Sequence, residues 1–542
     1  MKLDNTAENK EIVNQYRHLL RVSKWSREKG DMTIIRKAFD LAMESHKDMR
    51  RKSGEPYIFH PIAVARIAAE EIGLGTTSIV CALLHDVVED TDIKLEDIKL
   101  EFGDKVANII DGLTKISGVF DTNSPQAENF RKMLLTMADD VRVILIKLCD
   151  RLHNMRTLEH MSDKGQLKIA SETSFIYAPL AHRLGLYTIK SELEDLSLKY
   201  TQPALYQELK TKLNATKEQR SRFIRSFIKP IKSELDELDI TYEIKGRPKS
   251  IYSIYNKMTN KQLEFEDVYD LFAIRIIIDS DPEDEKMDCW NIYSIVTSIF
   301  KPNPERMRDW ISIPKTNGYE SLHATVMGPR GQWVEVQIRT TRMDAIAEKG
   351  YAAHWKYKDN TSNQDAANSL DSWIKQIREV LDDHDSNALE FLDKFKMSLY
   401  AEEVFAFTPR GMIKKLPKGS TALDFAFDIH TEIGTKCLGA KVNGKLVPLS
   451  YVIQNGDQIE ILTSAKQKPN KDWLSFAKTT KARTKIKQSL KDEKRVVASL
   501  GKEALSRKMR NANFDYTTEH LNKLIIYYGV EDELELTFRI GT

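Results

Sequence analysis

The sequence has few cysteines, no long hydrophobic run and almost no net charge. Its four cysteines, at positions 81, 149, 289 and 437, are far apart and form no CxxC pair. That spacing argues against a zinc ribbon or a disulfide framework and fits a reducing compartment. No segment approaches a membrane span, and the N-terminus MKLDNTAENKEIV lacks the apolar core of a signal peptide. These absences predict a cytoplasmic protein that does not contact membranes.

The composition is that of a folded multidomain protein. The chain has 542 residues, of which 41% are hydrophobic and 30% charged, and a chain of this length is expected to form roughly three to four domains. Lys and Arg number 82 against 80 Asp and Glu, so no overall attraction to polyanions is expected. The charge is local instead, because residues 466–510 hold fifteen Lys or Arg against four Asp or Glu.

The hydrophobic pattern changes along the chain. Helical spacing recurs almost throughout residues 1–200, in segments such as IIRKAFDLAMESH and TSIVCALLHDVVED. Residues 201–380 mix short alternating or β-branched runs, among them ITYEIKGR and LFAIRIII, with helical segments. A polar stretch from residue 360 and a linker helix at 381–400 lead to a β-rich module at 401–465, and residues 466–542 are again helical and basic.

Two histidines and two aspartates of the helical part form a candidate metal site. His60 lies in GEPYIFHP, His85 and Asp86 in CALLHDVVEDT, and Asp150 in LCDRLHNMRT. This mixed set of nitrogen and oxygen ligands suits Mn²⁺ or another borderline divalent ion. Neighbouring side chains on a helix point about 100° apart, so the HD pair binds one ion only if the two residues bracket it.

The same segment offers acid/base groups. Glu89 and Asp90 lie four residues beyond the HD pair and share its helix faces, which places them to activate a water or protonate a leaving group. The alternative is an acidic, solvated helix end, with the first histidine in a turn before a proline. Asp150 weighs against that alternative, because it follows the apolar run VILIKLC, where an isolated buried charge is costly.

These motifs, H…HDxxED…D with RRKSGEPYIFHP and CDRLHNMRT around them, resemble the hydrolase domain of the RelA/SpoT-homologue family, a branch of the HD phosphohydrolases. The resemblance implies removal of the 3′-pyrophosphate of (p)ppGpp, and the intact HDxxED implies a competent hydrolase. It implies Mn²⁺ ligands at His60, His85, Asp86 and Asp150, assistance to the attacking water by Glu89 and Asp90, basic residues beside the nucleotide at Arg51 and Lys52, and guanosine-side contacts at Asn154 and Thr157.

A second set of residues points to phosphates. GRPKSIYSIYNKM follows a predicted strand and opens a helix, where Gly246 permits a tight turn. Arg247 and Lys249 bring cations to the helix N-terminus, a natural phosphate site that Lys257 would extend. Arg275 interrupts the run LFAIRIII, either as part of this site or as a charge exposed on an edge strand.

The segment WVEVQIRT has the alternation of a strand with one polar face. Its valines and isoleucine fall on one side and Glu335, Gln337 and Arg339 on the other. Asp270 directly precedes LFAIRIII, so that two acidic positions are expected on neighbouring strands. A pair of carboxylates with Arg and Lys nearby is what Mg²⁺-dependent phosphoryl transfer needs.

Tyr319 follows Asn317 and Gly318 in PKTNGYESLHATV, where a loop aromatic either stacks on a base or packs in the turn. Together with GRPK and WVEVQIRT, this loop resembles the (p)ppGpp synthetase domain of the same family, which transfers pyrophosphate from ATP to the 3′-OH of GDP or GTP. The resemblance implies Mg²⁺ at Asp270 and Glu335, with Glu335 alternatively activating the 3′-OH, ATP contacts at Arg247, Lys249, Lys257 and Arg275, and a guanine stacked on Tyr319 beside Lys315, His323 and Gln337.

Two positions depart from the family pattern. Thr316 stands where the family usually has Pro. ERMRDW places Arg306-Met307-Arg308-Asp309 where bifunctional members carry RxKD and synthetase-only members an acidic ExDD. Because the Lys-to-Arg difference keeps the charge, the chain sides with the bifunctional type.

The C-terminal third resembles a TGS domain followed by a basic helical region. In this family the TGS domain contacts the acceptor end of deacylated tRNA, and His430 in DIHTEIG is the matching candidate, although it also fits a turn histidine of a β-grasp-like fold. The basic helices suit RNA phosphates or an ordinary solvated face. Family members normally continue into a zinc-binding or RNA-recognition-like region and an ACT domain, so a C-terminally truncated member, or one without this regulatory end, is expected.

The sequence therefore predicts a multidomain protein. Its parts are an all-α HD-type hydrolase domain (1–200), an α+β nucleotidyltransferase-like synthetase domain (201–380), a linker helix (381–400), a β-grasp-like TGS domain (401–465) and a C-terminal helical region (466–542). We expect a bifunctional stringent-response enzyme acting on ATP, GDP or GTP and (p)ppGpp, with ribosome and tRNA as partners of the full-length protein. The alternatives are mainly a hydrolase with a weak synthetase, or a ribosome- or tRNA-sensing module with idle sites.

Overall fold

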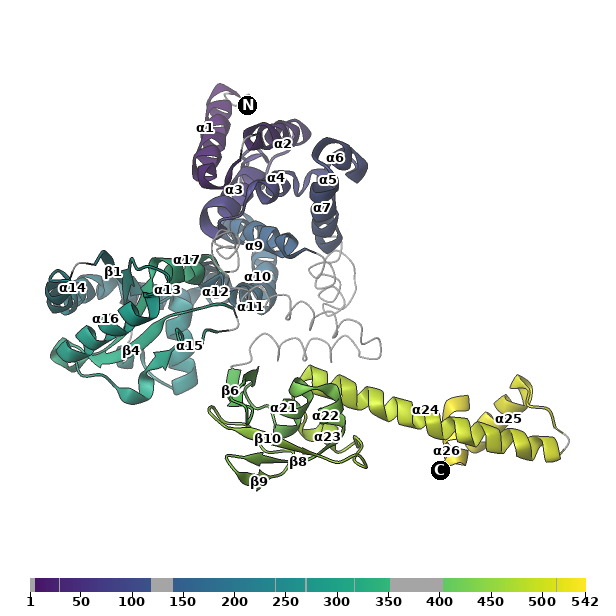
Figure 1. Cartoon of the computed structure of the whole chain (residues 1–542). Helices are drawn as coiled ribbons and strands as arrows, with labels where there is room; N and C mark the ends of the chain where they lie inside the picture. Colours follow the sequence, from purple (N-terminus) through teal and green to yellow (C-terminus); the bar gives the residue numbers. More distant parts are fainter. Residues whose placement is uncertain are drawn as a thin grey trace. The chain divides into compact units, whose positions relative to one another are not determined.

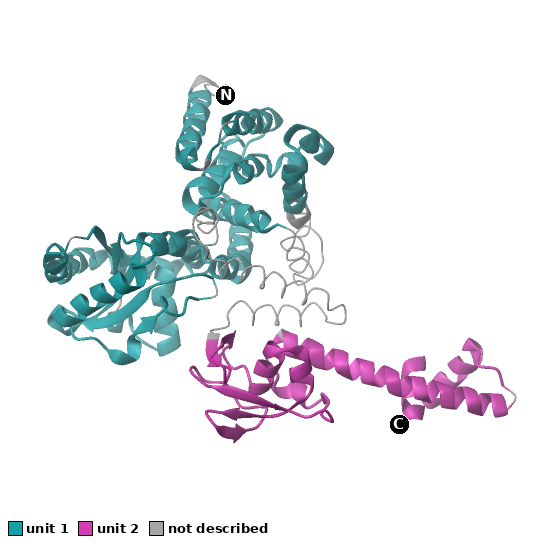
Figure 2. Cartoon of the chain, viewed as in Figure 1, with its two compact units in different colours: residues 1–378 teal, residues 379–542 magenta. Residues whose placement is uncertain are grey.

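The computed structural model describes residues 5–28, 30–117, 140–238, 240–268, 271–315, 317–350, 403–512 and 514–542. The chain divides into two compact units, residues 1–378 and 379–542 (Figure 2). The predicted linker helix at 381–400 and the polar stretch from residue 360 lie outside the described residues. Within the described ranges, no helix is both long and apolar enough to cross a membrane.

The N-terminal part of the first unit is helical, as the apolar periodicity predicts (Figure 1). Its centre is α4 (Thr76–Leu84), which is buried from Ser78 to Leu84 because almost every residue there is apolar. Helix α9 (Val141–Arg156) packs beside α4. The other helices are α1 (Asn5–Val22), α2 (Asp31–Ser45), α3 (Phe59–Arg66), the π-helical turn η2 (Ile67–Ile72), α5 (Val87–Asp90), α6 (Leu95–Phe102), α7 (Asp104–Ser117), α10 (Asp163–Glu172), the π-helical turn η4 (Thr173–Tyr177), α11 (Ala178–Arg183) and α12 (Tyr187–Thr201).

A five-stranded mixed sheet follows, in the order β1-β2-β5-β4-β3. Strands β2 and β5 are parallel, and the other neighbouring pairs are antiparallel. The strands are β1 (Tyr242–Pro248), β2 (Phe272–Ile278), β3 (Arg308–Asp309), β4 (Leu322–Met327) and β5 (Trp333–Thr340), and the helices around them are α13 (Pro203–Ala215), α14 (Lys217–Leu235), α15 (Ile251–Lys261), α16 (Glu285–Ile299) and α17 (Thr341–Lys349).

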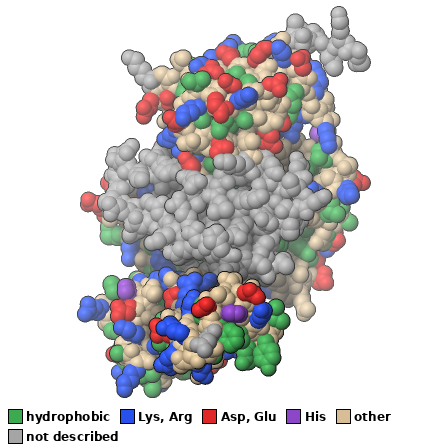
Figure 3. Space-filling view, turned by 90° about the vertical axis from the view of Figure 1, so that its right-hand side faces the viewer, with side chains coloured by type: hydrophobic (Ala, Val, Ile, Leu, Met, Phe, Trp, Pro, Cys, Tyr) green, Lys and Arg blue, Asp and Glu red, His purple; other side chains and the backbone are tan. Residues whose placement is uncertain are grey.

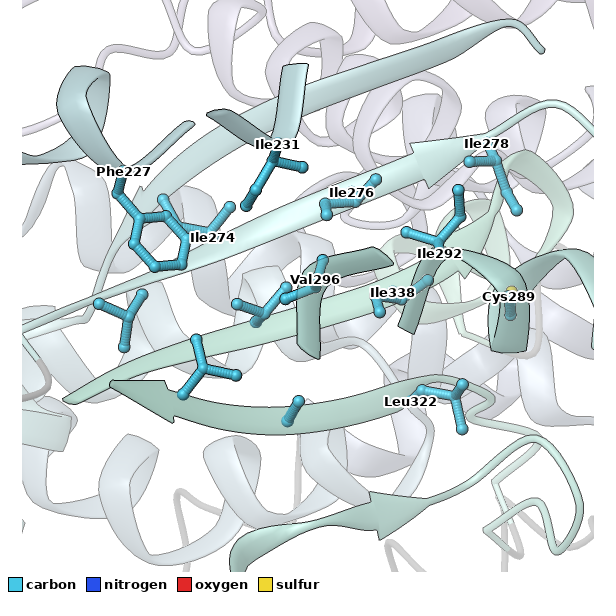
Figure 4. Packing of buried hydrophobic residues seen from close by; sticks show 14 of the residues in the cluster. Phe227, Ile231, Ile274, Ile276, Ile278, Cys289, Ile292, Val296, Leu322 and Ile338 are labelled. Carbon is cyan, nitrogen blue, oxygen red and sulfur yellow. The ribbon is translucent and has the colours of Figure 1, made fainter. Parts of the chain in front are cut away.

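The sheet has one apolar face and one polar face. Ile274 and Ile276 of β2 join Val336 and Ile338 of β5 in a core with α14 and α16 (Figure 4). Because side chains alternate along a strand, the residues between them lie on the opposite face. The register pairs Arg275 with Gln337 and His323 with Gln337, so polar side chains of three strands lie next to each other there. The alternation predicted for WVEVQIRT is confirmed.

The second unit contains the predicted β-rich module and the helical tail. Strands β6 (Glu403–Phe407) and β7 (Ile413–Pro417) form a hairpin, and β10 (Ile459–Thr463), β8 (Cys437–Val442) and β9 (Lys445–Val447) form a three-stranded sheet. Helix α21 (Ala422–Ile429) contributes Ala422 and Phe425 to their shared core and continues into α22 (Thr431–Thr435). The tail consists of α23 (Trp473–Phe476), α24 (Thr480–Asn511), α25 (Thr518–Tyr528) and α26 (Glu533–Gly541).

Candidate active sites

The four predicted metal ligands converge although they come from four elements. His60 lies in α3, His85 ends α4, Asp86 precedes α5, and Asp150 lies in α9. The Nε2 atom of His60 is 3.5 Å from Asp86 Oδ2 and 3.3 Å from Asp150 Oδ1, and His85 Nε2 is 3.1 and 4.0 Å from the same two oxygens. The helix is interrupted at residues 85 and 86, between α4 and α5, and this turn lets the two neighbouring side chains bracket one point, as the ligand prediction requires.

The donor set fits a divalent cation. His85 Nδ1 lies 2.8 Å from the Ala82 carbonyl, which only accepts, so Nδ1 carries a hydrogen and Nε2 is the ring nitrogen that can bind a metal once it has lost its proton. Nε2 is buried, faces carboxylate oxygens and has no hydrogen-bond partner in the described part of the chain. Burial alone lowers the pKa of His85, but Asp86 outweighs it and raises the pKa to about 9. The site therefore favours positive charge at this point, as a metal ion supplies.

His153 orients His60. The Nδ1 atom of His153 is 3.0 Å from Arg51 Nη1 and 2.8 Å from His60 Nδ1. Because Arg only donates, His153 Nδ1 accepts, His60 Nδ1 donates to it, and His60 Nε2 keeps its lone pair for the metal. Burial, His60 and Arg51 lower the pKa of His153 to about 2, so it stays neutral. Motif spacing assigns His153 no role. The signal in the sequence that could have pointed to it is its position three residues after Asp150, which places both side chains on one face of the helix.

Two further residues hold the aspartates. The Tyr57 hydroxyl donates to Asp86 Oδ2 at 2.7 Å. The Nζ atom of Lys147 lies 3.1 Å from Asp150 Oδ2, the oxygen that does not face the histidines. Both residues are part of the quoted motifs, but only the three-dimensional contacts assign them a role.

The residues predicted to contact the nucleotide line one cavity. It has a volume of about 630 Å³ and is bounded by Arg51, Lys52, Asn154, Thr157 and the predicted metal ligand Asp150. Arg51 also donates to the Asn154 amide oxygen at 2.8 Å. The predicted acid/base residues Glu89 and Asp90 are exposed on α5. Cations that the sequence did not single out, Arg151, Lys147 and Lys168, complete the wall.

The polar face of the sheet gathers the predicted synthetase residues. Glu335 Oε2 lies 3.3 Å from Lys249 Nζ, and Glu335 Oε1 lies 3.5 Å from His323 Nδ1 and accepts from Gln337 at 2.9 Å. Burial opposes ionisation of Glu335, but Lys249 and His323 outweigh it and lower its pKa. Burial also lowers the pKa of His323 to about 4. The second predicted acid, Asp270, lies outside the described residues.

The basic residues of this face meet a carboxylate that the sequence did not mark. Arg247 Nη1 and Arg275 Nη1 lie 3.4 and 2.8 Å from Glu348 Oε1 of α17. Arg275 is buried, so the edge-strand alternative for it is wrong. Lys257 lies half-buried on α15, the helix that follows GRPKS.

Tyr319 is packed in its loop, and the stacking of a base on it stays a prediction. Its side chain is 8% exposed, and its hydroxyl lies 2.8 Å from His323 Nε2 and 3.1 Å from Arg339 Nη2. The ring meets Tyr187 of α12 edge-on at 5.4 Å, while Lys315 Nζ lies 5.1 Å from its centre. Residues of the helical part therefore cover the loop on which a base would stack.

Helix α12 makes further contacts with the synthetase part. Asn317 Nδ2 donates to the Tyr187 hydroxyl at 2.8 Å, and the Thr188 hydroxyl donates to Glu348. Asp195 accepts from the backbone N–H groups of Ile251 and Tyr252 at 3.3 and 2.8 Å, which caps the N-terminus of α15. One helix thus touches the acceptor loop, the carboxylate that holds two arginines, and the helix after GRPKS.

In the second unit, His430 is exposed at the start of α22. Its Nδ1 accepts from the backbone N–H of Glu432 at 3.2 Å, so the exposed Nε2 carries the hydrogen. On the face of this unit seen in Figure 3, Lys and Arg side chains lie among hydrophobic ones. The predicted tRNA contact stays a prediction.

Comparison with known proteins identifies three domain families along the chain. The HD domain family matches residues 38–187, the region found in RelA and SpoT proteins matches residues 246–362, and the TGS domain family matches residues 404–463. A GTP pyrophosphokinase of Myxococcus xanthus is 43% identical over 94% of this chain and 68% of its own length. A guanosine-3′,5′-bis(diphosphate) 3′-pyrophosphohydrolase of Aquifex aeolicus is 43% identical over 94% of this chain and 72% of its own.

A third relative unites both activities in its name. The bifunctional (p)ppGpp synthase/hydrolase SpoT of Escherichia coli is 42% identical over 87% of this chain and 67% of its own length. The three family matches follow one another along the chain in the order predicted from the motifs. The chain belongs to the RelA/SpoT family of (p)ppGpp synthetases and hydrolases.

Proposed function

We propose that the two sites of the first unit catalyse opposite reactions of one alarmone. The synthetase converts ATP and GDP or GTP to AMP and (p)ppGpp, and the hydrolase converts (p)ppGpp and water to GDP or GTP and pyrophosphate. The observation that carries this function is the presence in one chain of a buried His₂Asp₂ cluster beside a basic cavity and of a separate, polar sheet face. Relatives named for the synthetase activity, for the hydrolase activity and for both support it.

In the hydrolase, His60, His85, Asp86 and Asp150 would hold a Mn²⁺ ion, which supplies Lewis-acid chemistry to the 3′-pyrophosphate when bound. Arg51 and Lys52 hold the charge of the nucleotide, and Asn154 and Thr157 face its guanosine. Glu89 and Asp90 take up the proton of the attacking water, since both are carboxylates on the short helix that directly follows Asp86.

In the synthetase, the donor and acceptor sit on the polar face of the sheet. Arg247, Lys249, Lys257 and Arg275 hold ATP, and Lys315, Tyr319, His323 and Gln337 hold the guanosine nucleotide. Asp270 and Glu335 would hold Mg²⁺, which would supply neutralisation of charge on the transferred group. The depressed pKa of Glu335 leaves its carboxylate ionised at neutral pH, ready to bind the metal or to accept the proton of the 3′-OH.

The two sites adopt reciprocal states, because running both at once only consumes ATP. In the described arrangement the hydrolase cavity is formed, whereas Tyr319 is buried against Tyr187 and Glu348 occupies two of the ATP-binding arginines. Binding of both substrates requires these contacts to break, which shifts the population away from this state. The same contacts favour the second candidate function, a hydrolase whose synthetase is weak.

The TGS-like module and basic tail would bind RNA. His430 offers an exposed Nε2–H donor to the acceptor end of deacylated tRNA, and the ribosome is the expected platform of the longer relatives. The absence of a spanning helix in the described ranges is compatible with a cytoplasmic protein.

One assay tests the proposal. The protein is incubated with ATP and GDP under Mg²⁺ alone, then with ppGpp under Mg²⁺ and after addition of Mn²⁺. AMP and ppGpp are expected in the first mixture, and Mn²⁺-dependent release of GDP and pyrophosphate in the second. Absence of synthesis with intact hydrolysis would leave the hydrolase candidate, and absence of both would refute the enzyme assignment.

A further inference from the structure

Arg342, near the start of α17, joins two acidic side chains from different parts of the synthetase fold. Its Nη2 atom lies 2.6 Å from Glu285 Oε2 at the start of α16 and 2.6 Å from Glu320 Oε2 in the loop before β4. Its Nε donates to both oxygens of Glu285, at 3.0 and 2.8 Å. The two carboxylates are 8% and 11% exposed and the guanidinium side chain 21%. One partly buried cation therefore forms ion pairs with two largely buried anions.

This arrangement depends on arginine chemistry. A guanidinium presents donors in a planar fork and can bind two carboxylates at once, whereas an ammonium acts as a compact point charge. Without a cation, Glu285 and Glu320 would be buried like charges, and one of them would have to take up a proton or turn to solvent. Glu285 is fixed independently, because the Thr340 hydroxyl donates to it at 2.6 Å. Among the described residues, no other side chain forms a hydrogen bond or ion pair with the Glu320 carboxylate, so Arg342 is the side chain that holds it.

Glu320 directly follows Tyr319, the residue proposed to stack on guanine. Arg339, three residues before Arg342 and 1% exposed, holds the Tyr319 hydroxyl at 3.1 Å. The end of β5 and the start of α17 thus supply two arginines that hold two successive residues of one loop. The same strand carries Glu335, so the loop is tied to the element that bears the proposed reacting carboxylate.

We propose that Arg342 is a positioning residue for the acceptor nucleotide: through Glu320 it fixes the loop that carries Lys315 and Tyr319, and so sets the affinity for GDP or GTP. This inference rests on the proposed synthetase function. Arg342 touches no residue assigned to ATP, so the affinity for ATP depends on it little. The two carboxylate partners of Arg342 allow its effect on the acceptor loop to be separated from its effect on the rest of the fold. Glu320 belongs to the acceptor loop, and Glu285 belongs to the helix behind the sheet.

The test compares Arg342→Met, Arg342→Lys and Glu320→Gln with the matched control Glu285→Gln in the full chain. Steady-state synthesis gives KM for GDP and for ATP, and ppGpp hydrolysis by the same preparations reports that the first unit is folded. We expect Arg342→Met to raise the KM for GDP on the order of tenfold, as for loss of a charge-assisted hydrogen bond, with the KM for ATP within about twofold. Glu320→Gln should shift the KM for GDP in the same direction, and Arg342→Lys should recover part of the loss.

Glu285→Gln keeps the loop contact, so it should lower the thermal unfolding midpoint without raising the KM for GDP. Equal increases in both KM values, or the same KM effect from Glu285→Gln as from Glu320→Gln, would make Arg342 a general structural strut and overturn the inference. If Arg342→Met does not fold, Glu320→Gln alone decides, because it changes only the loop side. A wild-type chain that makes no ppGpp would refute the synthetase function itself, which is a different outcome from normal synthesis with unaffected variants.

Discussion

Replacing His153 by Ala tests the hydrolase centre through a residue that is not itself a metal ligand. The substitution removes the acceptor of the His60 Nδ1–H and of Arg51, now 2.8 and 3.0 Å away. Loss of such an orienting partner typically lowers metal affinity about 10- to 100-fold, which corresponds to about 1.4–2.7 kcal/mol. The Mn²⁺ concentration for half-maximal ppGpp hydrolysis should rise by that factor, while synthesis by the same preparation is unchanged.

Two further variants sharpen the experiment. His153→Gln offers an amide oxygen that can accept from the same donors and should recover part of the metal affinity. His18→Ala, the same truncation on α1 away from the cavity, should leave the Mn²⁺ titration unaltered. An unchanged Mn²⁺ requirement in His153→Ala would refute the assignment of His60 as the Nδ1–H tautomer that presents Nε2 to the metal.

Three more predictions concern the contacts between the helical and synthetase parts. Asp195→Ala removes the acceptor that caps α15 at the Tyr252 N–H, a loss of about 1 kcal/mol of helix stability. The KM for ATP should then rise severalfold. An unaltered KM in an ATP titration would contradict a role of Asp195 in ATP binding. Tyr187→Ala uncovers Tyr319 and should lower the KM for GDP, whereas a higher KM would mean that the contact assists binding. Burial and nearby cations lower the pKa of His182 from 6.5 to about 4, so the fold favours its neutral form. The contribution of neutral His182 to the free energy of unfolding is present above pH 6.5 and is lost as the pH falls toward 4, by up to about 3 kcal/mol. His182→Asn should therefore make the thermal unfolding midpoint decrease less steeply with pH over this range. An unchanged slope would refute this role of His182.

Much of the hydrolase site could be predicted because its ligands belong to recognisable local motifs. His60, the HD pair and Asp150 each sit in a segment whose polarity conflicts with its apolar surroundings, and burial of an unpaired charge is costly. The convergence of the four was an expectation that the distances between them now support. The polar face of β5 could be predicted equally well, since the alternation of side chains along a strand follows directly from backbone geometry.

The contacts that restrain the synthetase site could not be read from local patterns. Tyr187 lies 132 positions before Tyr319, and no periodicity relates a helix of one domain to a loop of the next. Glu348 resembles an ordinary charge of an amphipathic helix until its distances to Arg247 and Arg275 are known. His153 is a similar case, because its role comes from the tautomer it imposes on a neighbour rather than from its own spacing.

The most direct test of two opposed sites in one chain is a separation of activities by Asp86→Ala and Glu335→Gln. Both reactions are measured for each variant, synthesis as ppGpp formed from ATP and GDP, and hydrolysis as Mn²⁺-dependent pyrophosphate release. Asp86→Ala should abolish hydrolysis and keep synthesis, because it deletes a proposed metal ligand that lies far along the chain from the sheet. Glu335→Gln should do the reverse. Retained hydrolysis in the first variant, near-normal synthesis in the second, or loss of both activities in either folded variant would contradict the account.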